Sequence, residues 1–159
     1  MDATGNLTPL VRSVPGLTIL PRTGSKNFIY GSATGGTLTM YLKKDGKEAE
    51  LLPIKTMADK CVWSTKKDAM VYCAVPENIG EGNYLDSWYL GRIHSSDTWW
   101  SINTDTGAAQ ILYTPEAGSN NSLDVIKPTI DDAGNYISFI NYADLSLWVL
   151  RIPKPTTSQ

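Results

Sequence analysis

The stretch "KPTIDDAGNYISFINYADLSLWVLRI", residues 127–152, alternates short apolar runs with turn-forming residues. The runs at 136–141 and 145–152 are rich in aromatic and β-branched residues, which favour strands. Between them and the preceding run, Asp131-Asp132-Ala133-Gly134-Asn135 supplies residue types that form tight turns. The same alternation recurs along the chain and helical periodicity is nearly absent, so the sequence predicts an all-β protein.

We expect eleven strands in three groups, each group forming one antiparallel sheet. The expected strands span 16–21, 27–32, 37–43 and 48–54, then 60–64, 69–75, 98–103 and 109–113, and finally 124–129, 136–141 and 145–152. The groups define three units at about 12–55, 56–116 and 117–153. A spare apolar segment at 7–11 precedes them, and residues 156–159 are expected to form a disordered tail.

The connection at residues 76–97 is too long for a tight hairpin, and long loops are often functional. It carries residue types that are enriched at binding hot spots. The candidate contacts are Tyr84, Asp86, Trp88, Tyr89, Arg92 and His94. The alternative, which we favour slightly, is that Trp88 and Tyr89 fold inward and cover the edge of their own sheet.

The chain offers little to catalysis or to metals. His94 is the single histidine, so a Ser-His-Asp triad or a multi-histidine metal site has little to build on. Asp131 and Asp132 are better explained as a turn than as calcium ligands. We therefore assign no catalytic residue, metal or cofactor. Trp99 and Trp100 are adjacent on an expected strand, so they should enter two different apolar layers.

Composition excludes further classes. The 159 residues include 14 Lys and Arg against 16 Asp and Glu, a net charge of −2 with no basic stripe, which argues against nucleic acid. No apolar run is long enough to span a membrane, and residues 1–5 do not have the charged start and apolar run that predict a secretory signal. Cys61 and Cys73 would oppose each other across a hairpin. They can pair there, but we expect two buried free thiols.

Two stretches resemble a known repeat. "CVWSTKKDAMVYCAVP" (61–76) and residues 127–152 are similar to the TolB-like, WD40-related propeller repeat: an apolar strand, a Ser-Pro-Asp-Gly turn, a second apolar strand and a Leu-Trp strand. The positions that match the repeat are Asp131, Gly134, Ile137, Phe139, Leu147 and Trp148 in the third unit and Ser64, Met70 and Tyr72 in the second. Aligning the second strands places Tyr30, Tyr72 and Phe139 in register.

The resemblance implies three blade-like sheets of a β-propeller. Because closed propellers typically have four to eight blades, it also implies either a fragment of a larger ring or a homodimer that completes six blades, with residues 7–11 as a closing strand. The function that it favours is a non-enzymatic binding or scaffold module that recognises a protein or other ligand through its loops. Two alternatives stay open: a hydrolase with carboxylates such as Asp86 and Asp97, and a structural repeat segment of a longer envelope-associated protein. A periplasmic or cell-surface setting is favoured.

Overall fold

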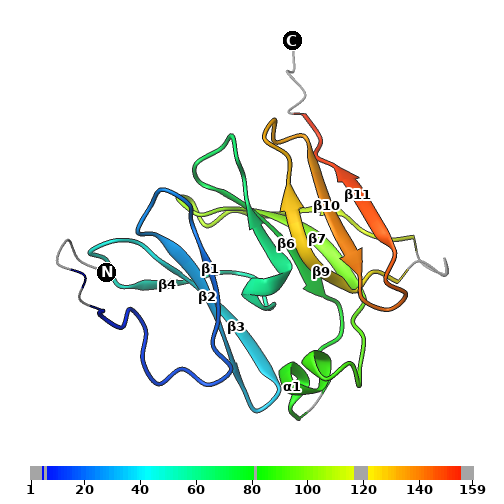
Figure 1. Cartoon of the computed structure of the whole chain (residues 1–159), viewed down its shortest axis with the longest axis horizontal. Helices are drawn as coiled ribbons and strands as arrows, with labels where there is room; N and C mark the ends of the chain where they lie inside the picture. Colours follow the sequence, from blue (N-terminus) through cyan, green and yellow to red (C-terminus); the bar gives the residue numbers. More distant parts are fainter. Residues whose placement is uncertain (1–4, 6, 81, 117–121, 155–159) are drawn as a thin grey trace.

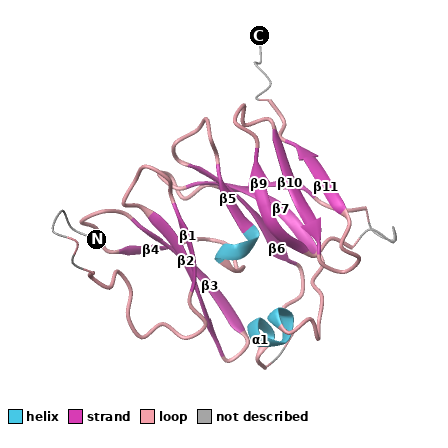
Figure 2. Ribbon diagram, viewed as in Figure 1, coloured by secondary structure: helices cyan, strands magenta, loops and turns pink. Residues whose placement is uncertain are grey.

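The protein folds into three small antiparallel sheets (Figures 1 and 2). The computed structural model describes residues 5, 7–80, 82–116 and 122–154, so the tail at 156–159 lies outside the described residues. The first sheet contains β1 (Thr18–Pro21), β2 (Phe28–Thr34), β3 (Thr37–Lys43) and β4 (Ala49–Leu51). The second contains β5 (Cys61–Trp63), β6 (Met70–Pro76), β7 (Asp97–Asn103) and β8 (Ala109–Tyr113). The third contains β9 (Val125–Ile130), β10 (Tyr136–Asn141) and β11 (Leu147–Arg151).

Neighbouring strands of each sheet follow one another in the sequence, and all the pairs except β6 and β7 are joined by short hairpin connections. Each of the eleven expected strands has a counterpart, and the all-β class is confirmed. The sheets are not closed into a ring. The segment at 7–11, expected as a closing strand, forms no strand, and Thr8 and Leu10 instead line a pocket together with Ile19 and Pro21 of β1.

The middle sheet is buried on both faces, because it packs between the other two. One apolar layer joins it to the first sheet and contains Ile29, Met40, Leu42, Val71 and Ile102. The other joins it to the third sheet and contains Tyr72, Ala74, Trp99, Val125, Ile137 and Phe139. Trp99 lies in the second layer and Trp100 packs against the first, which confirms that the two tryptophans point to opposite faces.

The predicted register of the second strands is wrong at one position. Tyr30 lies on the outer face of the first sheet, opposite to the buried face that carries Ile29. Tyr72 and Phe139 both lie in the apolar layer between the second and third sheets, so their side chains point toward each other's sheet. In stacked repeats, equivalent residues point in the same direction along the stack. Tyr30 and Phe139 point the same way, whereas Tyr72 points the opposite way. Val71 or Cys73, and not Tyr72, therefore corresponds to Tyr30 and Phe139.

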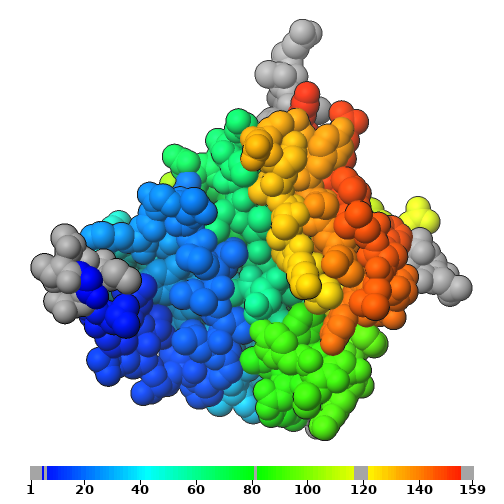
Figure 3. All heavy atoms as spheres, in the orientation of Figure 1, coloured from blue at the N-terminus to red at the C-terminus, as the bar shows by residue number. Residues whose placement is uncertain are grey.

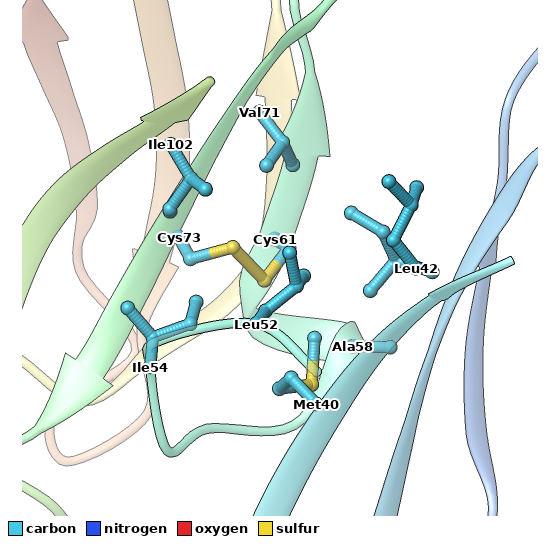
Figure 4. Packing of buried hydrophobic residues seen from close by; sticks show 10 residues of the cluster. Met40, Leu42, Leu52, Ile54, Ala58, Cys61, Val71, Cys73 and Ile102 are labelled. Atoms are coloured by element: carbon cyan, nitrogen blue, oxygen red, sulfur yellow. A yellow bond between two sulfur atoms is a disulfide. The ribbon is translucent and has the colours of Figure 1, made fainter. Parts of the chain in front are cut away.

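Cys61 and Cys73 form a disulfide, which corrects the expectation of free thiols. The two cysteines are directly paired on β5 and β6, with Cα atoms 4.1 Å apart. Both side chains lie in the layer between the first two sheets, surrounded by residues such as Leu52, Ile54 and Val71 (Figure 4). The hairpin pairs the two cysteines directly, as their spacing predicted, so the two sulfur atoms are close enough to form the bond.

Reducing this disulfide should destabilise the protein. The bond closes a short loop with a sequence separation of 12, for which chain entropy predicts a loss of about 3 kcal/mol. Urea denaturation of the oxidised protein, of the reduced protein and of the Cys61→Ala/Cys73→Ala variant would measure it. If oxidised and reduced protein unfold at the same urea concentration, the bond contributes nothing to stability.

Two short helices also form, although the sequence predicted none. The 3₁₀-helix η1 (Ala58–Lys60) directly precedes β5, and the α-helix α1 (Tyr84–Tyr89) lies within the long connection. Helix α1 buries Tyr84, Leu85 and Trp88, spaced as on one helix face. It is only six residues long, too short to leave a helical period in the sequence.

Candidate functional site

The long connection after β6 bridges the first and third sheets. Helix α1 lies between these sheets at one end of the molecule, where the connection fills the space that they leave (Figures 1 and 3). Tyr84, Leu85 and Trp88 form a separate apolar cluster with Leu38 of β3. Ile126 of β9 and Tyr142 of the β10–β11 turn pack against it. The connection is thus part of the structural core.

The structure divides the six candidate contact residues into two sets. Tyr84 and Trp88 are buried, with 4% and 3% of their surface exposed. The inward alternative expected Trp88 and Tyr89 to be buried, so it agrees with the structure at Trp88 and is wrong at Tyr89. Tyr89 is 49% exposed, and Asp86, Arg92 and His94 are exposed as well. Trp88 and Tyr89, which are adjacent on this short helix, therefore face the core and the solvent respectively.

Beneath α1 lies a fully buried ionic cluster centred on Lys60, the last residue of η1. The Lys60 ammonium donates to Ser95 Oγ at 2.9 Å, Asp97 Oδ2 at 2.6 Å and Asp124 Oδ1 at 2.8 Å. The side chains of Lys60, Asp97 and Asp124 are all 0% exposed. Each of the three N–H groups of the Lys60 ammonium thus has an acceptor. A buried charge is tolerated when it is paired and fully hydrogen-bonded in this way.

Asp124 is the hub of this cluster. Its Oδ1 also accepts the indole N–H of Trp88 and the hydroxyl of Ser95, each at 2.7 Å. Its Oδ2 lies 2.9 Å from His94 Nδ1, which orients an imidazole whose ring packs edge-on against Tyr142. Asp124 thereby holds α1 and the loop that follows it against the start of β9.

The environment shifts the pKa values of these groups in different directions. Burial raises the pKa of Asp97, against the attraction of Lys60. Burial also acts to raise the pKa of Asp124, but the Lys60 ammonium and the donors around it outweigh that effect and lower it. Burial, together with the carboxylates of Asp97 and Asp124, raises the pKa of Tyr84 to about 12 despite the neighbouring Ser95.

An aromatic pocket opens on the outer side of α1. It has a volume of about 310 Å³, within the range of small-ligand sites. The residues that line it are Asp59, Trp88, Tyr89, Ile126, Lys127 and Tyr142. Trp88 packs edge-on against Tyr89 and Tyr142, with ring centroids 5.2 and 5.6 Å apart. The Tyr89 hydroxyl donates to Asp59 Oδ2 at 2.6 Å. Tyr89 is therefore held by this hydrogen bond and by its ring contact with Trp88, and Tyr142 is held by its own ring contact with Trp88.

A β-bulge in β9 positions one charged residue of this pocket. Ile126 pairs with Ile140 and Thr129 pairs with Ser138, so that Lys127 and Pro128 together oppose Phe139. Lys127 has a φ of 51°, in the left-handed region that non-glycine residues rarely adopt. The bulge thus places an exposed lysine at the pocket.

A second pocket is less suited to a ligand. It has a volume of about 490 Å³ and lies among the hairpin tips of the first two sheets. Its charged residues pair with one another: Arg22 with Asp68 at 2.7 Å and Lys44 with Asp105 at 3.0 Å. These groups therefore have their partners already.

Sequence reasoning missed most of this site. It gave Asp124 no role and considered Asp97 only as a hydrolase carboxylate. Lys60, Lys127 and Tyr142 were not singled out, because the residues that they meet are distant in sequence. Lys60 and Asp124 are 64 residues apart, and Lys127 shares the pocket with Asp59 and Tyr89. Asp131 does behave as expected, since its carboxylate accepts the N–H groups of Asn135 and Tyr136 in the β9–β10 turn.

Comparison of the chain with protein-family models, with curated proteins and with solved structures finds no match. Within the described residues, no group of three or more His, Cys, Asp and Glu side chains is arranged to hold a metal ion. In the same part of the chain, no helix has both the length and the apolar character needed to cross a membrane.

Replacing Lys60 should unfold this end of the molecule. Lys60→Met leaves two buried carboxylates without a counter-charge, which should cost about 3–5 kcal/mol of the free energy of unfolding. The loss should shrink at acid pH, because protonated carboxyl groups need no cation. Urea denaturation at neutral and acid pH measures both effects.

Lys44→Met is the matched control, because it breaks a lysine–aspartate pair at the surface and should cost less than about 1 kcal/mol. Equal losses for the two variants would show that the buried cluster does not depend on its cation.

Proposed function

We propose that this protein is a non-enzymatic binding module and that its ligand occupies the aromatic pocket beside α1. The supporting observation is the pocket itself, about 310 Å³ in volume and walled by Trp88, Tyr89 and Tyr142. Aromatic side chains contribute large contact areas, and here mutual ring contacts and hydrogen bonds fix them before binding. Fixed walls reduce the entropy lost when a ligand binds.

The binding role is better supported than hydrolysis. The Asp97 side chain is 0% exposed and its carboxylate is paired with Lys60, so it has no contact with solvent or substrate. Asp86 lies on the exposed side of α1, where its carboxylate accepts a hydrogen bond from Asn83. The two carboxylates proposed for a hydrolase thus have different environments, whereas the pocket needs no reacting group.

The proposal extends to the architecture, in which the three sheets are blades of a TolB-like propeller and a second copy completes the ring. Each outer sheet face carries an apolar row that crosses every strand. On the first sheet, register aligns Ile19, Tyr30, Tyr41 and Leu51. On the third, it aligns Ile126, Ile140 and Leu147. Ile19, Leu51 and Leu147 are 47%, 66% and 73% exposed, so both rows offer surface to another sheet.

The disulfide supports an extracytoplasmic setting, periplasmic or cell-surface, because disulfides persist mainly in oxidising compartments. In such a setting the chain would act as a binding or scaffold unit of the cell envelope.

The mass in solution tests the pairing. Light scattering after size exclusion should give about twice 17.4 kDa for the protein and 17.4 kDa for Leu147→Glu, which places a charge in the row on the third sheet. Lys154→Glu, an exposed change outside the row, should stay dimeric. A monomeric wild-type protein would contradict the pairing and favour a repeat segment of a longer protein.

Indole, a neutral planar probe, tests the pocket. Titration followed by amide chemical shifts should perturb α1 and the start of β9, and Tyr89→Ala should weaken binding by about fivefold, since one aromatic contact is lost. Tyr113→Ala removes a comparably exposed tyrosine from β8 and should leave indole binding unchanged. Shifts scattered over the surface, or equal affinity in both variants, would refute the binding proposal.

A further inference from the structure

The backbone at Lys127 is costly. A φ of 51° costs an ordinary L-residue roughly 1–2 kcal/mol, whereas glycine adopts it freely. Lys127 also precedes Pro128, and residues before proline prefer extended conformations. A bulge of this type commonly has glycine at the strained position. The chain nevertheless has a lysine there, so its side chain is the feature left to explain.

Lys127 and Asp59 are the two charged residues of the pocket, and they differ in their partners. The Asp59 carboxylate accepts the Tyr89 hydroxyl at 2.6 Å. Among the described residues, no ion pair or side-chain hydrogen bond is recorded for the Lys127 ammonium, and the residue is exposed. In the described part of the chain, the Lys127 ammonium is therefore the charged group of the pocket that has neither an ion pair nor a hydrogen bond.

The inner face of the Trp88 ring, at the floor of the pocket, is already occupied. The Lys60 ammonium lies 4.7 Å from the centroid of the Trp88 ring, so one face of that ring already has a cation. Trp88 is fixed by its hydrogen bond to Asp124, and Tyr89 by its hydrogen bond to Asp59. What remains accessible is a set of flat apolar walls, with the unpaired Lys127 ammonium and the Asp59 carboxylate that is hydrogen-bonded to Tyr89 beside them.

We infer that the pocket binds a small planar carboxylate, whose ring packs against Tyr89 and Tyr142 and whose carboxylate pairs with Lys127. This inference rests on the proposed function and adds the chemical class of the ligand. A free small molecule fits the volume of about 310 Å³, and the pairing requires only that the Lys127 side chain reach over the ring.

Two isosteric probes test the class of ligand. Indole-3-carboxylate and indole-3-carboxamide have the same shape and differ in charge. Titrations followed by amide chemical shifts at low salt should show the carboxylate binding about fivefold more tightly, as expected for one partly exposed ion pair. Added salt should reduce the difference, since screening weakens exposed pairs.

Variants at position 127 separate charge from backbone. Lys127→Arg should keep the preference for the carboxylate. Lys127→Asn, which tolerates the left-handed region, and Lys127→Gly should bind both probes alike. Lys127→Gly should also raise the melting temperature by relieving the strain, whereas Thr129→Gly, at an exposed position of the same strand without positive φ, should lower it.

Each outcome has one meaning. Equal binding of both indoles in the pocket of the wild-type protein would overturn the carboxylate class and leave the binding function standing. If neither probe shifts the amide signals of the pocket residues, both proposals are overturned. A Lys127→Gly variant that melts no higher than the wild-type protein would show that the lysine is not held at a cost, which removes the argument for its role.

Discussion

The rest of the structure depends on the compensation of one buried charge, that of Lys60. Its ammonium is excluded from water, so stability requires that Ser95, Asp97 and Asp124 be in place. These partners come from the loop after α1 and from the starts of β7 and β9, and Lys60 itself leads into β5. The middle sheet, the third sheet and the long connection are therefore coupled. None of these segments can move away without leaving a charge unpaired in the core.

This coupling links the structural role of the connection to the binding role that we propose for it. The inner side of α1 places Trp88 on the ionic cluster, where its indole N–H donates to Asp124 and its ring lies over Lys60. The outer side carries Tyr89 into contact with Asp59, the residue before Lys60. The pocket is thus built directly on the buried cluster, which fixes Trp88, whereas Tyr89 is held by its hydrogen bond to the exposed Asp59.

The sequence predicted what local rules determine. Strand positions followed from alternation and from turn residues, as at Asp131, whose carboxylate accepts two backbone N–H groups. Local rules did not predict features that depend on the packing of one sheet on another, on redox state or on contacts between residues far apart in the sequence. The face of Tyr72 was assigned by aligning aromatic residues, although a shift of one residue reverses the face of a strand. The pairing of Cys61 with Cys73 depended on redox state, which spacing does not determine. The ionic cluster joins residues up to 64 positions apart, and no single-sequence pattern links them.

The bulge at Lys127 shows which feature of the site is not explained by folding. Leu145 also has a positive φ, 59°, but its N–H donates to Asn141 O within the β10–β11 turn, so turn geometry accounts for it. Lys127 lies inside a strand. The bulge and Pro128 interrupt the ladder of an edge strand, which discourages pairing with other chains, and glycine at position 127 would allow the same interruption at lower cost. Protection of the edge therefore accounts for the bulge and the proline, and it leaves the lysine side chain to be explained by what that chain can bind.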